Sequence, residues 1–236
     1  NKKGQIFTIL AVLIIVLMFV SFEIYTYIHQ RDAIQTRVAT MNSFLNSIET
    51  NLERQLYISG FRIIFLANSE ITSTGVYIDV DDFFNEAFFN GRVNGAENNS
   101  IIMGARYIDL VNSLNNKAAK INVNISLSNP SFIISQSDPW NINVTLISNF
   151  TMTDKKNLAR WEKVQRVSTL IPITFFEDPI FILNSDAGIS RKINQTPYEG
   201  NYANGTNVTN LLAHVNGKYY AANPNAPSFL NRLEGD

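Results

Sequence analysis

The chain has 236 residues and a formal net charge of −1, from 19 Lys and Arg against 20 Asp and Glu. It contains no cysteine, which excludes disulfide frameworks and thiolate metal sites. The balanced charge argues against a nucleic-acid-binding protein, so we expect no nucleic acid among its partners.

The first predicted element is a membrane helix close to the start of the chain. Ile6 to Phe22 is an uncharged apolar run, and with its extension to Ile28 it reaches the roughly 30 Å thickness of a hydrocarbon core. The run favours insertion by roughly 4 to 8 kcal/mol, which Glu23 at its far end does not cancel. Two lysines precede it, so the positive-inside rule places the N-terminus inside the cell and residues 30–236 outside. No small-residue cleavage site follows, and we expect the segment to be retained.

The same helix is predicted to continue beyond the membrane. No Pro or Gly interrupts residues 5–59, and Gly60 is the first possible weak point. Apolar side chains recur every three or four positions at Ile34, Val38, Met41, Leu45, Ile48, Leu52 and Leu56. This stripe fits either a coiled-coil stalk or a helix whose distal half packs on the protein's own head. The region thus divides into a membrane helix, 1–29, and a helix extension, 30–74.

Residues 75–183 are predicted to form a mixed α and β head. A short helix is expected over 80–91 and a longer one over 104–120. Apolar and polar residues then alternate, which predicts strands over 121–128, 132–136, 140–152 and 158–174. Turns are expected between them at Asn129–Pro130, Ser137–Pro139 and Asp154–Asn157. The predicted fold class is therefore α+β, with a long N-terminal helix packed on a four-stranded antiparallel sheet.

The remaining residues, 184–236, differ in composition from the head. They are rich in Asn, Gly, Pro and Ala, and only 208–215 has a helical pattern. We expect a turn-rich C-terminal arm or connector.

Seven Asn-x-Ser/Thr sequons are candidate glycosylation sites, and all of them follow residue 97. They are Asn98, Asn124, Asn143, Asn149, Asn194, Asn204 and Asn207. Strand alternation places Asn124, Asn143 and Asn149 on the polar face of the sheet, opposite the side chains that cover the core. Glycans are sterically allowed there, although Asn and Thr are also common on any solvated sheet face.

The junction Lys2-Lys3-Gly4-Gln5, followed directly by the apolar run, resembles the processing region of type IV pilins and their archaeal relatives. Pilins also place a long N-terminal helix against an antiparallel sheet. The resemblance implies that a prepilin-type peptidase cuts between Gly4 and Gln5, and that the helix then moves from the membrane into the core of a filament of identical copies. Bacterial pilins carry Glu at the fifth mature position, which here is Ile9, so the archaeal branch fits better. Residues 1–4 are still present, which corresponds to an unprocessed form or to a membrane-resident relative.

Two functions fit these features. The first is a structural subunit of an extracellular, pilus-like filament on an archaeal cell surface, and the second is a single-pass, N-glycosylated surface protein for binding or adhesion. An enzyme is not expected, because His29 and His214 lack a partner at metal-ligand spacing and no P-loop, Rossmann or nucleophile-elbow motif occurs. Asp79, Asp81 and Asp82 are interpreted as helix-capping residues rather than a calcium site, so no cofactor is expected.

Overall fold

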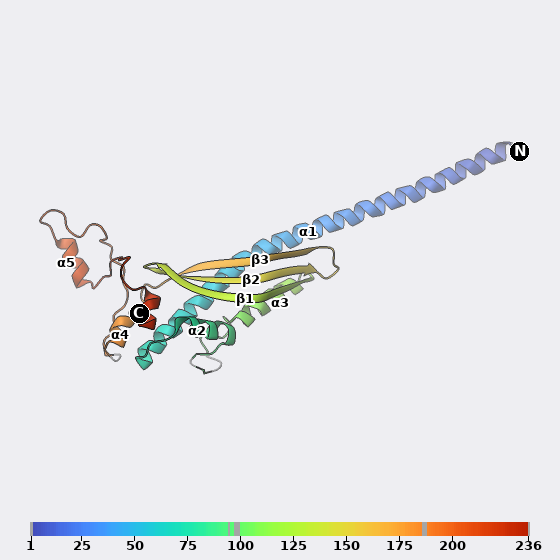
Figure 1. The fold of residues 1–236 in the computed structure, drawn as a ribbon. Coiled ribbons are helices and arrows are strands. Elements are labelled where there is room, and N and C mark those ends of the chain that lie inside the picture. The colour runs from blue at the N-terminus through green and yellow to red at the C-terminus, as the bar shows by residue number, and fades with distance from the viewer. Residues whose placement is uncertain (1, 94, 97–99, 186–187, 236) are drawn as a thin grey trace.

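The computed structural model describes residues 2–93, 95–96, 100–185 and 188–235. Its elements are, in chain order, α1 (Lys2–Thr74), α2 (Val80–Asn85), the π-helix η1 (Glu86–Asn90), α3 (Tyr107–Ala119), β1 (Val123–Asp138), β2 (Asn141–Asp154), β3 (Arg160–Pro172), α4 (Pro179–Leu183), α5 (Thr209–Asn216) and α6 (Phe229–Glu234). Figure 1 shows α1 as a long rod whose N-terminal part projects from the molecule and whose C-terminal part lies beside the sheet. This arrangement confirms the α+β class.

One uninterrupted helix forms the spine of the molecule. α1 has 73 residues, which corresponds to a length of about 110 Å at 1.5 Å per residue. It ends at Gly75, whose φ of 66° lies in the left-handed region and whose N–H donates to the Ile71 carbonyl over 2.8 Å. The predicted continuation of the N-terminal apolar helix is confirmed.

Only the distal half of α1 packs on the head. Met41, Leu52 and Leu56 are fully buried, whereas Ile34 and Val38 stay exposed. This part of the helix lies against β3 and β2. Of the two interpretations that the stripe allowed, packing on the protein's own head is the one found.

The helix comes very close to the sheet at Gly60. A Cβ at this position would lie 2.4 Å from Ile171 Cδ1 and 3.1 Å from Val144 Cγ2. Gly60 therefore works as a packing position, where the missing side chain lets helix and sheet approach, and α1 continues through it without a break.

The sheet has three antiparallel strands in the order β1-β2-β3, so the prediction of four strands was wrong. The expected turn at Asn129–Pro130 lies inside β1 as a bulge, because Ser128 pairs with Asn149 and Ser131 with Ile147. Two residues of β1 thus oppose one residue of β2. The proline is tolerated because β1 is an edge strand, where a missing N–H need not remove a hydrogen bond of the ladder.

The other two predicted turns connect the strands as expected. Asp138 Oδ1 accepts hydrogen bonds from the backbone N–H groups of Trp140 and Asn141, at 2.6 and 3.0 Å. Asp154 Oδ2 accepts from the N–H of Lys156 over 2.8 Å in the turn between β2 and β3. Short polar side chains that bond their own turn are the physical basis of these signals.

The helices of the head agree with their predicted places. Asp79 caps α2 by accepting a hydrogen bond from the Asp82 N–H over 2.9 Å, which confirms the capping interpretation. The helical stretch ends at Gly91 with a φ of 69°, and its second half, η1, is π-helical. α3 lies within the predicted range 104–120.

The C-terminal region leaves the head and returns to it. α5 belongs to a lobe formed by residues 194–220, which is closed at its base by the hydrogen bond from the Tyr220 N–H to the Asn194 carbonyl and projects at the end of the molecule opposite the N-terminus (Figure 1). α6 then packs against α4 and α1, with Phe229 and Leu233 buried and the Ile78 N–H donating to the Leu233 carbonyl over 3.1 Å. The sequence predicted α5 but not α6.

Candidate functional site

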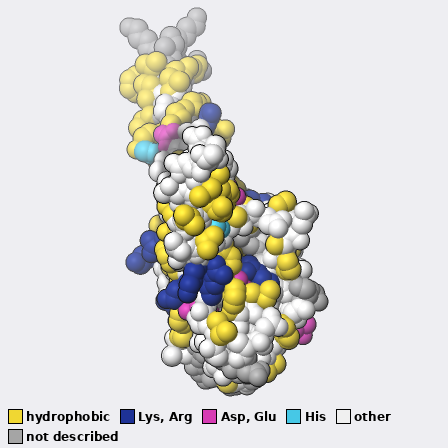
Figure 2. Space-filling view, turned by 90° about the vertical axis from the view of Figure 1, so that its left-hand side faces the viewer, with side chains coloured by type: hydrophobic (Ala, Val, Ile, Leu, Met, Phe, Trp, Pro, Cys, Tyr) yellow, Lys and Arg dark blue, Asp and Glu magenta, His cyan; other side chains and the backbone are white. Residues whose placement is uncertain are grey.

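The projecting part of α1 presents apolar side chains to its surroundings in every direction. Every Ile, Leu, Val, Met and Phe from Phe7 to Ile28 is exposed. An 18-residue window in this helix reaches a mean hydropathy of 2.7 with no residue buried, so by length and composition it could cross a membrane. In Figure 2 hydrophobic side chains dominate the upper visible part of the projecting helix, and charged and His side chains appear further down. Such a surface is compatible with a segment that lies in lipid or packs on other protein.

A polar belt marks the end of this segment. The Tyr25 hydroxyl and His29 Nε2 are 2.7 Å apart, one helical turn from each other, and their rings meet edge to face. Glu23 and Tyr27 are exposed beside them. Amphipathic rings and a reachable charge are typical of the boundary between hydrocarbon and water.

The predicted processing site lies at the start of the same helix. Gly4 and Gln5 fall in the first turns of α1, which begins at Lys2. Gly costs roughly 1 kcal/mol relative to Ala in a helix, so Gly4 weakens the helix directly before the predicted cleavage point.

A clamp joins α1 to the head where the buried half begins. Arg37 Nε donates to Asp154 Oδ1 over 2.5 Å, and its Nη2 donates to the carbonyls of Ile121 and Asn122 over 2.5 and 2.9 Å. Burial pushes the pKa of Asp154 up, but the hydrogen bond from Arg37 and those from the backbone of its own turn outweigh burial, and the pKa is lowered. The carboxylate form therefore holds the clamp.

Three sequons occupy the open face of the sheet, as strand alternation predicted. Asn124 and Asn149 are exposed and Asn143 is half-buried. The neighbouring positions of β2 on the other face, among them Val144 and Phe150, are buried against the core. A glycan on any of the three would extend away from α1.

Three further sequons lie in the projecting lobe, and Asn98 lies outside the described residues. Asn204 and Asn207 are exposed. Asn194 differs, because its Oδ1 is buried without a hydrogen-bond partner and the sequon threonine, Thr196, is also buried, with its Oγ1 3.0 Å from His214 Nδ1. Asn194 is thus less accessible to modification than the other two in the folded chain.

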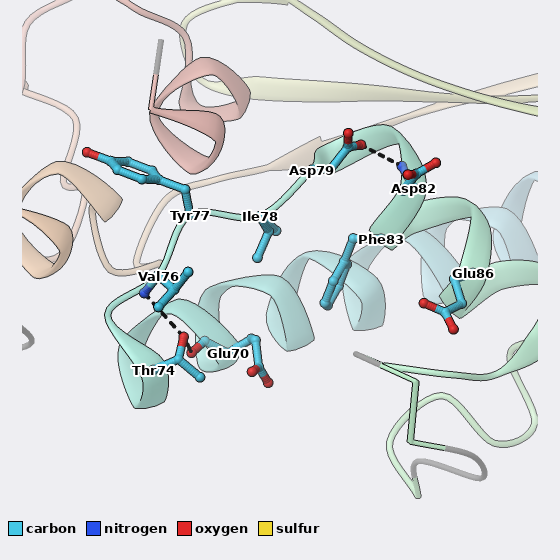
Figure 3. A pocket seen from close by; sticks show the side chains of 9 residues that line it. All are labelled: Glu70, Thr74, Val76, Tyr77, Ile78, Asp79, Asp82, Phe83 and Glu86. Carbon is cyan, nitrogen blue, oxygen red and sulfur yellow. Dashed lines mark hydrogen bonds between the residues drawn. The ribbon is translucent and has the colours of Figure 1, made fainter.

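An open pocket of about 420 Å³ lies between the end of α1 and α2. Glu70, Asp79, Asp82 and Glu86 line it together with aromatic and aliphatic side chains, and Figure 3 shows Asp79 directed at the backbone of Asp82, which it caps. Within the described part of the chain, no group of three His, Cys, Asp or Glu side chains could hold a metal ion.

A buried polar cluster that the sequence did not reveal anchors the C-terminal region. Asp178 Oδ2 accepts from the Tyr220 hydroxyl over 2.8 Å and pairs with Arg232 Nη1 at 2.8 Å. Burial and the neighbouring Asp178 carboxylate raise the pKa of Tyr220. The Arg191 guanidinium lies over the Tyr220 ring at 4.7 Å. Asp178 also caps α4 by accepting a hydrogen bond from the Ile180 N–H over 3.2 Å, but its other partners come from distant parts of the chain, so no local pattern predicts the cluster.

Comparison of the chain with protein-family models, curated proteins and solved structures found no match in any of the three. The resemblance of the junction at Gly4 and Gln5 to type IV pilins therefore stays a prediction.

Proposed function

We propose that this chain is a structural subunit of a pilus-like filament on the cell surface, in which copies pack through their N-terminal helices. The proposal is carried by the continuity of α1. The exposed apolar segment and the buried distal half belong to one helix without Gly or Pro from residue 5 to 59. Arg37 clamps this helix where the head begins. The apolar segment therefore keeps a fixed direction relative to the head.

A fixed direction favours assembly over simple tethering. A binding protein on a membrane anchor gains reach from a flexible linker rich in Gly and Ser, and no such linker separates residues 28 and 41. In a repeating assembly, by contrast, every head must take the same position relative to the contact that joins the copies.

The same helix suits two environments in succession. An α-helix satisfies its backbone hydrogen bonds internally, so the apolar segment is stable in lipid and in a dry bundle of identical helices. In the proposal, Ile6 to Ile28 first crosses the cytoplasmic membrane with the N-terminus inside. A prepilin-type peptidase then cuts between Gly4 and Gln5, and the helix enters the filament core.

The open sheet face is compatible with an outermost position. Asn124, Asn143 and Asn149 lie on the side of the sheet away from α1, so glycans there would not meet a bundle of α1 helices. We propose that these sites are glycosylated at the cell surface. Glycopeptide mass spectrometry of the native protein tests this, and unmodified peptides at all three sites would reject it.

A second candidate function is that of a single-pass, glycosylated binding or adhesion protein. It is favoured by one feature of the uncharged run from Ile6 to Phe22, which contains only Thr8, Ala11 and Ser21 as small residues. Close helix packing in membranes relies on small residues, whereas the bulky side chains here make a bundle looser.

Electron microscopy of the surface of producing cells separates the two functions. We expect filaments with this chain as the repeating unit, and intact-mass analysis of filament material should show Gln5 as the first residue. Particles confined to the membrane, with Asn1 still present in surface material, would contradict the filament proposal and support the anchored protein.

A further inference from the structure

The side of α1 that faces away from the head changes from polar to aromatic along its length. Its exposed positions are polar at Asn46 and Thr50 and then become aromatic at Tyr57, Phe61 and Phe65. These three rings are 37%, 40% and 45% exposed and follow one another at intervals of four residues. A helix face that meets only water stays polar, as the preceding turns do. The aromatic stretch therefore indicates a contact surface.

A loop after β3 completes an aromatic groove with this stretch. Phe175 is 71% exposed and has a φ of 74°, a left-handed conformation that is costly for a bulky residue. Its N–H donates to the Ile193 carbonyl over 2.8 Å. Phe61, Phe65 and Phe175 line a groove of about 500 Å³, with Glu177 and Lys192 also among the lining residues. We call this surface the aromatic groove.

The projecting lobe carries the second unpartnered apolar surface. α5 has no buried residue, and its sequence contains no Asp, Glu, Lys or Arg. Val208, Leu211, Leu212 and Val215 are 43%, 41%, 57% and 61% exposed and recur with helical spacing. An uncharged apolar helix face of this kind fits a hydrophobic groove without burying a charge.

The lobe is held away from the head of its own chain. At its base, the Tyr220 hydroxyl donates to Asp178 and Arg191 Nη2 donates to the Lys218 carbonyl, each over 2.8 Å. Within the lobe, Asn210 Nδ2 donates to the Asn201 carbonyl over 2.9 Å. Figure 1 shows the lobe projecting from the end of the molecule. These ties favour contact of α5 with another molecule.

We propose that α5 of one copy docks into the aromatic groove of a second copy. The proposal rests on the proposed function, because a filament brings the heads of neighbouring copies together. Groove and helix are different surfaces of the same chain, so each copy offers both, and the contact is heterologous. Heterologous contacts that do not close into a ring produce open, filamentous arrays. The heads would thus be joined in addition to the bundle of α1 helices.

Engineered disulfides test this contact, because the chain has no cysteine of its own. The variant Leu212→Cys, Phe65→Cys of the full chain is oxidised on the cells that produce it. Docking between copies yields a ladder of dimers, trimers and longer products on a non-reducing gel. In the matched control, Leu212→Cys with Leu158→Cys, the second thiol lies in the turn between β2 and β3, away from the groove, at a position that is 44% exposed, and we expect about tenfold less product.

Two results would overturn the docking proposal: a ladder no stronger than the control's, or a disulfide formed only within single chains. Both replaced residues, Leu212 and Phe65, are exposed, so the variant keeps its core. Microscopy of the same cells tests the filament separately. Filaments without a ladder refute the docking alone, a ladder without filaments refutes the filament alone, and the absence of both refutes both.

Discussion

The two halves of α1 carry similar apolar side chains in opposite surroundings. From Phe7 to Ile28 they point in every direction and are exposed, whereas from Met41 to Ile71 most of them form one buried face on the protein's own head. The difference is one of pattern. A one-sided stripe can be covered by one neighbouring surface, and polar residues complete the rest of the helix. A segment that is apolar all round needs apolar surroundings on every side, and the head of one chain can cover only one side.

The largest effect should come from truncating the buried half. Leu56→Ala removes a fully buried side chain and should lower the stability of the head by about 2–5 kcal/mol, because a cavity remains. Ile14→Ala is the control and should leave the head unchanged. Thermal unfolding of the full chain in non-ionic detergent, followed by Trp140 and Trp161 fluorescence, measures both. Equal losses of stability in the two variants would show that both halves of α1 unfold together with the head as one cooperative unit.

An added charge should affect the exposed apolar half of α1 and not the rest of the helix. Ile14→Arg places a cation at the centre of the apolar segment and should cost about 2.5–3.5 kcal/mol of membrane insertion. The control Ile34→Arg changes an exposed position beyond that segment and should insert normally. The fraction of chain that resists extraction from membranes at high pH reports insertion. Normal insertion of the Ile14→Arg variant would argue against the segment as the membrane anchor.

A smaller effect is expected where helix and sheet approach each other. Gly60→Ala gains up to about 1 kcal/mol of helix propensity but loses about 1–3 kcal/mol, because the new Cβ meets Ile171 and Val144. We expect a net loss of stability in the same unfolding measurement. Asn46→Ala, on the exposed side of α1, gains propensity without a clash and should be neutral or slightly stabilising. A gain for both variants would mean that the side chain of Ile171 moves aside at little cost.

The smallest effect should be a pH dependence at the boundary between the halves. The folded-state pKa of Asp154 is lower than its usual 3.8, so this carboxylate stabilises the fold above that pH. The contribution begins to fall as the pH drops below 3.8 and is lost once the pH passes below the lowered pKa. Arg37→Gln should reduce the loss of stability between pH 7 and pH 3, as measured by unfolding at each pH. If the Arg37→Gln variant loses as much stability between pH 7 and pH 3 as the unchanged chain, the ion pair of Arg37 and Asp154 does not contribute to the pH dependence.

Local patterns were sufficient to predict much of the fold. The unbroken helix to residue 74, the Asp79 cap and the turns at Asp138 and Asp154 all depend on neighbours within a few positions. The placement of Asn124, Asn143 and Asn149 on the open face follows from the two-residue period of a strand. Such features depend little on where the rest of the chain lies.

The failures arose where a residue's role depends on distant parts of the chain. Pro130 was interpreted as a turn, but its strand is at the edge of the sheet and accommodates it as a bulge. Gly60 was interpreted as a weak point, but it is the position where α1 meets Ile171. Neither an edge position nor a close approach can be read from neighbouring residues.

The sequence by itself determined that the chain begins with a helix apolar on all sides and continues as a helix with one apolar face, because periodicity is a local property. The tertiary structure decided what covers that face, which side of α1 stays bare at Phe61 and Phe65, and where α5 projects. These outcomes follow from contacts between segments that are far apart in the sequence, and only the packed core brings those segments together.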